Sequence, residues 1–249
     1  MLTTAPKLAL VLSAGGMYGA YQAGVWDVLA PFFHPDLIVG ASVGSLNGWM
    51  IASKVPSQDL VDRWTSLDGI ENVRFRMPSR VADGCIHPGL LQSWIEDLAA
   101  NLHPLLEYAL VVNRFPAFSS KLFRYPEIGA RHLMASCAVP GLLPMQKIDG
   151  QMYADGGVVN PLPLWAADEL GATAIVSINV MRRRREFKPS RSIPLIEIDP
   201  SQPLGPALDS VYWDREKAQR WIDLGRKDAE NRKHLVVECL EQQLRHSFA

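Results

Sequence analysis

The sequence predicts an α/β fold of three layers, in which helices cover both faces of a mainly parallel central sheet. The first 53 residues alternate strand, turn and helix twice, a pattern typical of parallel sheets. The first expected strand, 8–12, is an unbroken apolar run, as in strands buried on both faces. With 249 residues, 48% of them hydrophobic, the chain is long enough for one large domain.

The N-terminal elements follow from apolar runs and turn residues. A glycine-rich turn, 13–19, separates the first strand from a helix that Pro31 ends. The next apolar, partly β-branched run leads into a tight turn around Ser42. The elements expected in order are a strand over 8–12, a helix over 20–30, a strand over 36–39 and a helix over 45–53.

The middle of the chain is less regular, and we interpret residues 54–125 as an insertion within a single domain spanning 1–249. A stripe of apolar residues marks a helix near its centre. Pro126 fits the first position of a later helix. The expected elements are helices over 57–67, 88–102 and 126–138 and strands over 105–113 and 121–125.

The C-terminal third resumes the alternation. Asp149-Gly150 is typical of a hairpin turn, and Gly171 is typical of a helix end. The elements expected are a hairpin over 145–154, a helix over 162–170, strands over 172–180 and 193–198, and two charged helices over 213–232 and 235–244.

Composition excludes several classes of function. A net charge of −1 gives no field for nucleic acid, so no nucleic-acid partner is expected. Three cysteines at unrelated spacings indicate a reducing, cytoplasmic compartment. No run of 18 apolar residues predicts a transmembrane helix. No ligand spacing is present, so we expect neither a metal nor a cofactor.

The strongest motif is the pentapeptide from Gly40 to Gly44. A buried strand precedes it and a helix follows, which is the context of a nucleophile elbow. The small residues Gly40 and Gly44 allow close backbone approach at such a turn. Ser42 is therefore the candidate nucleophile, although a helix N-cap serine is the simpler alternative.

Acyl transfer also needs donors for the oxyanion and a base. The backbone N–H of Val43 and those of the Gly15-Gly16 turn are candidate donors, because adjacent parallel strands bring both turns to one sheet edge. The base is less evident. From spacing alone, Asp155 before Gly156 and Gly157 fits an ordinary Asp-Gly turn better than a catalytic carboxylate.

Four segments, in order, resemble the patatin-like phospholipase family of serine acyl hydrolases, and the resemblance covers about residues 7–180. It implies a patatin-like fold and a dyad in which Ser42 is the nucleophile and Asp155 the base. It also implies a lipid or ester substrate, as for a phospholipase or esterase. The segments are Leu10 to Val25, Gly40 to Gly44, Ala135 to Pro144 and Ile148 to Pro163.

Two residues depart from the family pattern. Ala14 occupies the place of the first of three successive glycines, and Tyr18 stands where the family usually has Arg or Lys. A small Ala14 is tolerated if its φ is negative. The loss of a cation at Tyr18 weakens any expectation of a phospholipid headgroup more than that of ester hydrolysis.

Three other readings compete. The glycine-rich turn nearly fits a dinucleotide fingerprint, but Ser42 follows the second strand where an acidic residue belongs. An α/β-hydrolase triad would use Asp155 with His234 or His246. A degenerate family member would be a lipid-binding or scaffold protein, and the Tyr18 departure favours it.

The run of four arginines from Arg182 to Arg185 has two interpretations. A solvated loop after a strand is the simpler one. The other is contact with anionic lipid headgroups, where each basic residue contributes about 1 kcal/mol. The sequence therefore admits a peripheral membrane contact.

Overall fold

The structure, a computed structural model, describes residues 6–66, 77–181, 187–190 and 192–247. Within them, eight strands form one sheet: β1 (Leu8–Leu12), β2 (Leu37–Ala41), β3 (Glu107–Phe115), β4 (Ser119–Arg124), β5 (Gln146–Ile148), β6 (Gln151–Asp155), β7 (Ala174–Ile178) and β8 (Leu195–Ile198). Their order is β5-β6-β3-β2-β1-β7-β8, and β4 also pairs with β3. The neighbours β3, β2, β1, β7 and β8 pair parallel with one another in that spatial order. In contrast, β4 and β6 pair antiparallel with β3, and β5 pairs antiparallel with β6.

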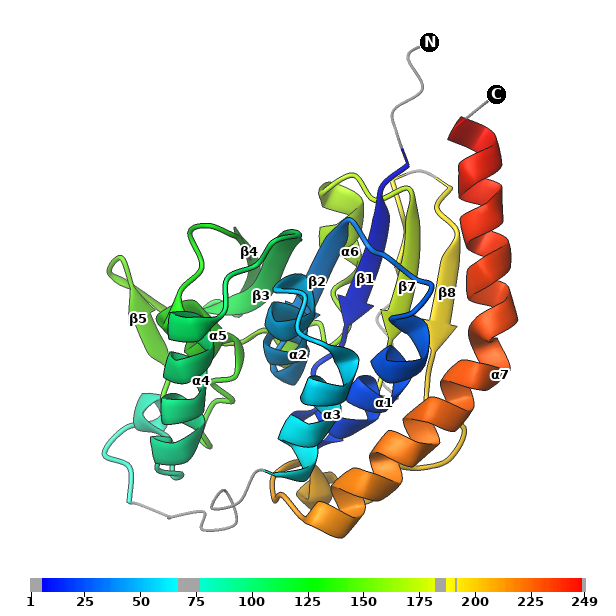
Figure 1. The fold of residues 1–249 in the computed structure, drawn as a ribbon. Coiled ribbons are helices and arrows are strands. Elements are labelled where there is room, and N and C mark those ends of the chain that lie inside the picture. The colour runs from blue at the N-terminus through cyan, green and yellow to red at the C-terminus, as the bar shows by residue number, and fades with distance from the viewer. Residues whose placement is uncertain (1–5, 67–76, 182–186, 191, 248–249) are drawn as a thin grey trace.

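Helices cover both faces of the sheet, with α1, α2 and α7 on one face and α6 on the other (Figure 1). The longer helices are α1 (Gly19–Leu29), α2 (Val43–Ala52), α3 (Ser57–Thr65), α4 (Gly89–Asn101), α5 (Ala130–Ser136), α6 (Leu164–Glu169) and α7 (Arg215–Ser247). Single turns of 3₁₀ helix form η1 (Gly16–Tyr18), η2 (Val81–Asp83), η3 (Gly156–Val158) and η4 (Ala207–Ser210). The predicted three-layer α/β fold is confirmed.

The central strands are buried on both faces, as the apolar run of 8–12 indicated. Leu10 and Leu12 pack with the helices α1 and α2, while Ala9 and Val11 pack in a second cluster with α6. All four are fully buried. Burial of a leucine or valine side chain contributes roughly 1.5–3 kcal/mol, so this two-sided packing fixes the strand that carries the glycine-rich turn.

The C-terminal prediction was wrong in one respect. Two helices were expected over 213–232 and 235–244, but α7 is a single helix, Arg215–Ser247. Its buried residues Ile222, Ala229 and Val236 recur every seven residues and so continue one apolar stripe across the expected break. Lys233 and His234, at the expected break, are compatible with a helix and include neither Gly nor Pro.

The segment 54–125 contributes both helices and sheet. Its strands β3 and β4 lie in the sheet, and β3 pairs with β2. Its helices α3 and α4 lie on the face that α1 and α2 cover (Figure 1). The division into one domain with an insertion stays a prediction. None of the described helices is long and apolar enough to cross a membrane.

Two strands meet end to end along one edge of β3, and this junction positions the site. The ladder with β2 ends at the pair Ala41↔Val111, and the ladder with β6 begins at Asp155↔Val112. The strand β4 overlaps both ladders, so it must occupy the opposite edge of β3. The carboxyl ends of β2 and β6 therefore converge at neighbouring residues of β3, and Ser42 follows directly after β2.

Candidate active site

Ser42 lies at the junction of β2 and α2 with strained backbone angles, φ 53° and ψ −128°. Such angles are rare for a residue with a side chain and cost on the order of 1–3 kcal/mol. The glycines of the motif make the turn sterically feasible. A Cβ at Gly40 would collide with the Gly44 carbonyl, and a Cβ at Gly44 would collide with the Leu12 carbonyl. The geometry is that of a nucleophile elbow.

Hydrogen bonds hold the backbone of Ser42 on both sides. Its N–H donates to Ser136 Oγ at 3.0 Å, and its carbonyl accepts the Ser45 hydroxyl at 2.6 Å. The Ser136 hydroxyl donates to the Val111 carbonyl of β3 at 3.0 Å. Ser136 was not singled out from the sequence, because no spacing links α5 to the elbow.

Asp155 is the last residue of β6, 3% exposed. Its N–H donates to the Ala138 carbonyl at 2.9 Å, and its carbonyl accepts the Asn113 side chain at 2.6 Å. The following Gly156 lies against the Val111 carbonyl, where a Cβ would collide. These contacts place the backbone of Asp155 beside the same stretch of β3 that positions Ser42.

The carboxyl group of Asp155 has one satisfied oxygen and one free oxygen. Gly157 N–H donates to Oδ1 at 2.6 Å, whereas buried Oδ2 has no hydrogen-bond partner among the described residues. Burial raises the pKa of Asp155 to about 6, and interactions with the Ser42 hydroxyl and the Gly157 N–H oppose that rise. The Ser42 hydroxyl is thus near enough to affect the carboxyl without a completed hydrogen bond.

A cavity of about 800 Å³ opens over these groups. Ser42 and Asp155 line it together with Val43 and the glycine-rich turn, and Gly157 also reaches it. Most other lining residues are apolar, among them Leu46, Trp64, Leu91, Trp94, Leu142 and Leu143. The structure therefore brings the candidate nucleophile, base and oxyanion donors to one apolar cavity, which suits a substrate with a long hydrocarbon part. The motif glycines Gly40, Gly44 and Gly156 do not line this cavity.

The glycine-rich turn follows β1 with left-handed backbone angles, φ 157° at Gly15 and φ 56° at Gly16. Among the described residues, the N–H groups of Gly15 and Gly16 donate to no protein acceptor. Val43 is the first residue of α2, where backbone N–H groups also lack helical partners. Ala14 is not among the residues of positive φ, so the alanine fits its place without strain.

A buried polar network behind the turn escaped the sequence analysis. The Gln22 side chain donates to the Ser13 carbonyl at 2.7 Å, and Asn47 donates to Gln22 Oε1 at 2.9 Å. The Trp64 indole donates to Asn47 Oδ1 at 3.0 Å. Gln22 and Asn47 are each 1% exposed. The sequence signal that could have revealed this network is the presence of Gln22 and Asn47 within two otherwise apolar helices, because buried polar side chains need hydrogen-bond partners.

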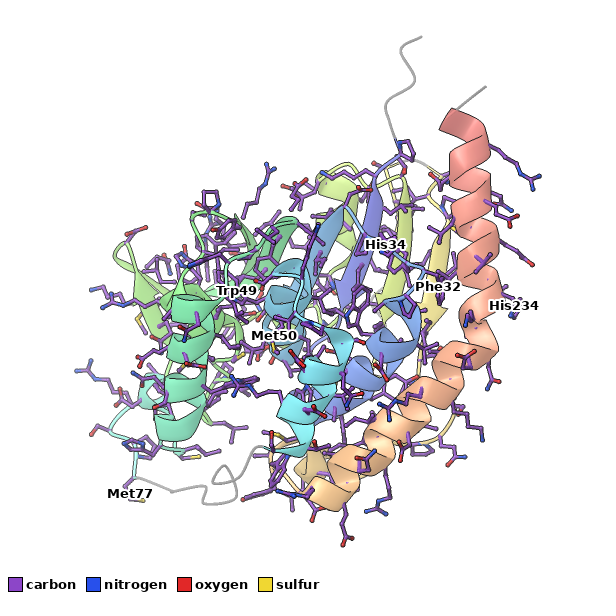
Figure 2. The ribbon with its side chains drawn as sticks, in the orientation of Figure 1. Phe32, His34, Trp49, Met50, Met77 and His234 are labelled. Carbon is purple, nitrogen blue, oxygen red and sulfur yellow. The ribbon has the colours of Figure 1, made fainter. Side chains whose placement is uncertain are left out.

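Of the two histidines proposed for a triad, His234 does not line the cavity. His234 is exposed and projects from α7 away from the sheet (Figure 2). The side chain of His246 lies outside the described part. His87, which the sequence analysis did not single out, lines the cavity. Its Nδ1 accepts the Gly89 N–H at 3.2 Å, so the neutral ring carries its proton on Nε2 and offers a donor there.

Two further expectations concern metals and arginines. Within the described residues, no group of three or more His, Cys, Asp or Glu side chains could hold a metal ion. The run from Arg182 to Arg185 lies outside the described residues. It follows Met181, which lines the cavity.

Comparisons with known proteins give several relatives, and two of them share 28% identity with this chain. An uncharacterised NTE family protein of Mycobacterium tuberculosis (strain ATCC 25618 / H37Rv) is 28% identical over 194 residues, or 76% of this chain and 52% of the relative. Patatin-like phospholipase domain-containing protein 6 of Homo sapiens is 28% identical over 192 residues, or 71% of this chain and 14% of the relative. The chain thus spans about half of the mycobacterial relative and a small part of the human one.

The fold also has a solved counterpart. The crystal structure of VipD from Legionella pneumophila superposes with a TM-score of 0.53, covering 92% of this chain and 67% of that one. At 12% identity, this is a likeness of fold. A family model for patatin-like phospholipases matches residues 10–168, more than half of the chain. The resemblance found in the sequence is confirmed, and the chain belongs to the patatin-like phospholipase family.

Proposed function

We propose that this chain is a lipid acyl hydrolase that cleaves carboxylic esters with a Ser42–Asp155 dyad. The observation that carries the proposal is the pairing of a strained serine with a buried carboxylate whose Oδ2 has no partner in the described part of the chain. A buried acceptor without a donor is costly, and a serine hydroxyl turned toward it would supply that donor. The apolar cavity over both groups supports an acyl chain as the bound part of the substrate.

In the acylation step, Asp155 accepts the hydroxyl proton of Ser42 while Oγ attacks the ester carbonyl carbon. The negative charge passes to the carbonyl oxygen, where N–H groups of Gly15, Gly16 and Val43 stabilise it. The bond to the alcohol then breaks, and protonated Asp155 returns the proton to the leaving oxygen. An acyl-Ser42 intermediate and the free alcohol result.

Deacylation repeats these steps with water. Asp155 accepts a proton from water, whose oxygen attacks the acyl carbon, and the same N–H groups stabilise the second oxyanion. The bond to Ser42 Oγ breaks, and the proton on Asp155 returns to that oxygen. The carboxylic acid leaves, and both residues return to their starting protonation states.

The test compares the parent and four variants on one soluble p-nitrophenyl ester, with folding checked by thermal unfolding. Ser42→Ala should abolish turnover and labelling by a fluorophosphonate probe. Asp155→Asn keeps the shape, removes the basic oxygen and should remove nearly all turnover. His87→Gln, and His234→Gln combined with His246→Gln, should stay within a few-fold of the parent.

Each competing reading has its own signature in this experiment. Loss of activity in a folded histidine variant would replace the dyad with a histidine-based mechanism. A folded parent that neither hydrolyses esters nor labels with the probe would instead point to a lipid-binding protein without catalysis. Full activity in Ser42→Ala would show that the nucleophile is elsewhere.

We also propose that the chain draws its substrate from a lipid surface as a peripheral protein. Val158 lines the cavity and is 49% exposed, and Leu208, two residues before the cavity-lining Ser210, is 63% exposed. Leu208→Asp should weaken sedimentation with lipid vesicles and leave hydrolysis of a soluble ester unchanged. Val237→Asp, at a 37% exposed residue of α7, is the matched control. Equal vesicle binding by both variants and the parent would contradict the proposal.

A further inference from the structure

Residues 204–211, which we call the strap, cross the glycine-rich turn of the site. The Ser210 carbonyl lies where a Cβ on Gly16 would be, and Gly16 has φ 56°. The strap and the turn are therefore in direct backbone contact, with no room for a side chain between them. Ser210 and Val211 line the cavity beside Gly15 and Gly16. The strap forms the wall of the cavity next to the candidate oxyanion donors.

Tyr18 connects this wall to the turn. Its hydroxyl donates to the Pro206 carbonyl at 2.7 Å, and its ring meets Trp221 of α7 edge to face, with centroids 5.0 Å apart. The Trp221 indole donates to the Leu204 carbonyl at 2.8 Å. Two strap carbonyls thus accept hydrogen bonds from two rings that pack on each other, and one of these rings belongs to η1.

The surroundings keep Tyr18 neutral. It is 7% exposed, and burial together with the Asp209 charge raises the pKa of its hydroxyl. The group therefore stays a hydrogen-bond donor over the physiological range. Asp209 itself pairs with Lys217 of α7 at 2.6 Å, which ties the middle of the strap to the same helix. A lysine or arginine in place of Tyr18 would have to bury its charge against Trp221.

We propose that Tyr18 is a specificity-determining residue, which fixes the strap as a wall that binds acyl chains long enough to reach Val211. The proposal rests on the proposed ester hydrolysis and adds the identity of one binding surface. It also gives a role to the departure from the family pattern at Tyr18. The tyrosine fastens a wall of the cavity at the place where the family's Lys or Arg would put a positive charge. An octanoyl chain can contact this wall with several methylene groups, whereas an acetyl group offers only one methyl group.

The experiment measures kcat and KM on p-nitrophenyl acetate and p-nitrophenyl octanoate. Tyr18→Phe deletes one oxygen and retains the ring contact with Trp221. We expect its KM for the octanoate to rise about threefold or more, while both constants for the acetate change by less than about 1.5-fold. Lys217→Ala loosens the strap from its other side and should shift the octanoate KM in the same direction.

Tyr212→Phe is the matched control, because Tyr212 lies one residue beyond the strap and is 36% exposed. It should match the parent on both esters. Asp209 and Val211 are strap residues whose N–H groups donate to strap carbonyls, those of Pro206 and Leu208. Their amide hydrogen exchange should be faster in Tyr18→Phe than in Tyr212→Phe, since loss of the Tyr18–Pro206 bond frees the strap.

Each alternative result would contradict one claim of the proposal. Faster exchange in Tyr18→Phe with an unchanged octanoate KM would show that the strap does not bind substrate. Unchanged exchange would show that Tyr18 does not fasten it. A parent inactive on both esters would refute the proposed function. Calorimetric binding of free octanoate needs no turnover and would still test whether the strap binds acyl chains. The proposal predicts weaker octanoate binding by Tyr18→Phe than by Tyr212→Phe.

Discussion

The backbone N–H of Ser42 donates to the hydroxyl of Ser136 at 3.0 Å, and that hydroxyl donates to the Val111 carbonyl at 3.0 Å. Ser136 is fully buried, so water does not compete for these bonds. Two residues later, the Ala138 carbonyl accepts the N–H of Asp155. The carboxyl end of α5 therefore holds the backbones of both candidate catalytic residues.

The first prediction concerns Ser136→Ala. The change leaves the Ser42 N–H without its acceptor and removes one donor from the Val111 carbonyl, which should lower the free energy of unfolding by about 1–3 kcal/mol. A displaced nucleophile should also lower kcat about tenfold or more with little change in KM. Steady-state kinetics on a soluble ester, with urea unfolding, measures both.

Ser177→Ala is the control for Ser136→Ala. Ser177 lies in β7, is equally buried, and its hydroxyl has no partner among the described residues. Its removal should leave kcat unchanged and cost little stability. If the two alanine variants had equal kcat, Ser136 would have no part in positioning Ser42.

The second prediction concerns the pH dependence of turnover. The base must be ionised to accept the Ser42 proton, and burial raises the pKa of Asp155 to about 6. The value of kcat/KM should therefore fall on the acid side with a midpoint near pH 6, well above the ordinary aspartate value of about 4. Initial rates between pH 4.5 and 8 give the midpoint. Constant kcat/KM down to pH 4.5 would exclude a base with this pKa.

The third prediction concerns stability and the same carboxyl group. Because its pKa is raised from 3.8 to about 6 on folding, the folded protein keeps a proton that the unfolded chain has lost between these pH values. The contribution of Asp155 to the free energy of unfolding therefore falls as pH rises from about 4 to 6, by on the order of 3 kcal/mol. The asparagine of Asp155→Asn does not ionise, so the free energy of unfolding of this variant should not show this decrease.

Denaturant unfolding of both proteins from pH 4 to pH 7 tests this relation. The difference between Asp155→Asn and the parent should grow in favour of the variant up to about pH 6 and then level off. A difference independent of pH would mean that Asp155 has the same pKa in the folded and unfolded chains.

The fold and the elbow could be predicted because their signals are local. An apolar run followed by a glycine-rich turn specifies a strand and a sharp connection, and the pairing of β1 with β2 follows from the connecting helix. Gly40 and Gly44 could be singled out because few residues fit a turn so tight. Asp155 could not be assigned from spacing alone, because Asp-Gly is also an ordinary turn.

The rest depends on contacts between segments far apart in the chain. Ser136 reaches Ser42 across 94 residues, and Tyr18 reaches Pro206 across 188. Neither pairing leaves a periodic or compositional mark in the sequence. The continuous helix α7 was missed for a related reason, since its apolar stripe is sparse and packs mainly against α1, which lies far away in the sequence.

The last prediction tests the contact between Ala14 and Gly157. A Cβ on Gly157 would collide with the Ala14 methyl and approach Asp155 Oδ1 within 3.0 Å. Gly157→Ala should therefore disturb both the oxyanion turn and the carboxylate, and lower kcat about tenfold or more. Ala14→Gly alone restores the family's glycine and should cost only about 0.5–1 kcal/mol of stability.

The double variant should recover part of the loss, because Ala14→Gly removes the methyl that the new side chain meets. Gly156→Ala is the matched control: its Cβ would collide with the Val111 carbonyl of β3, which Ala14→Gly cannot relieve. We expect a double-mutant cycle on kcat and on the free energy of unfolding to show favourable coupling of at least about 0.5 kcal/mol for Ala14 with Gly157. The same cycle with Gly156 should be additive. Equal coupling in both cycles would show that Ala14→Gly acts by making the whole turn more flexible. No coupling in either cycle would contradict the Ala14–Gly157 contact.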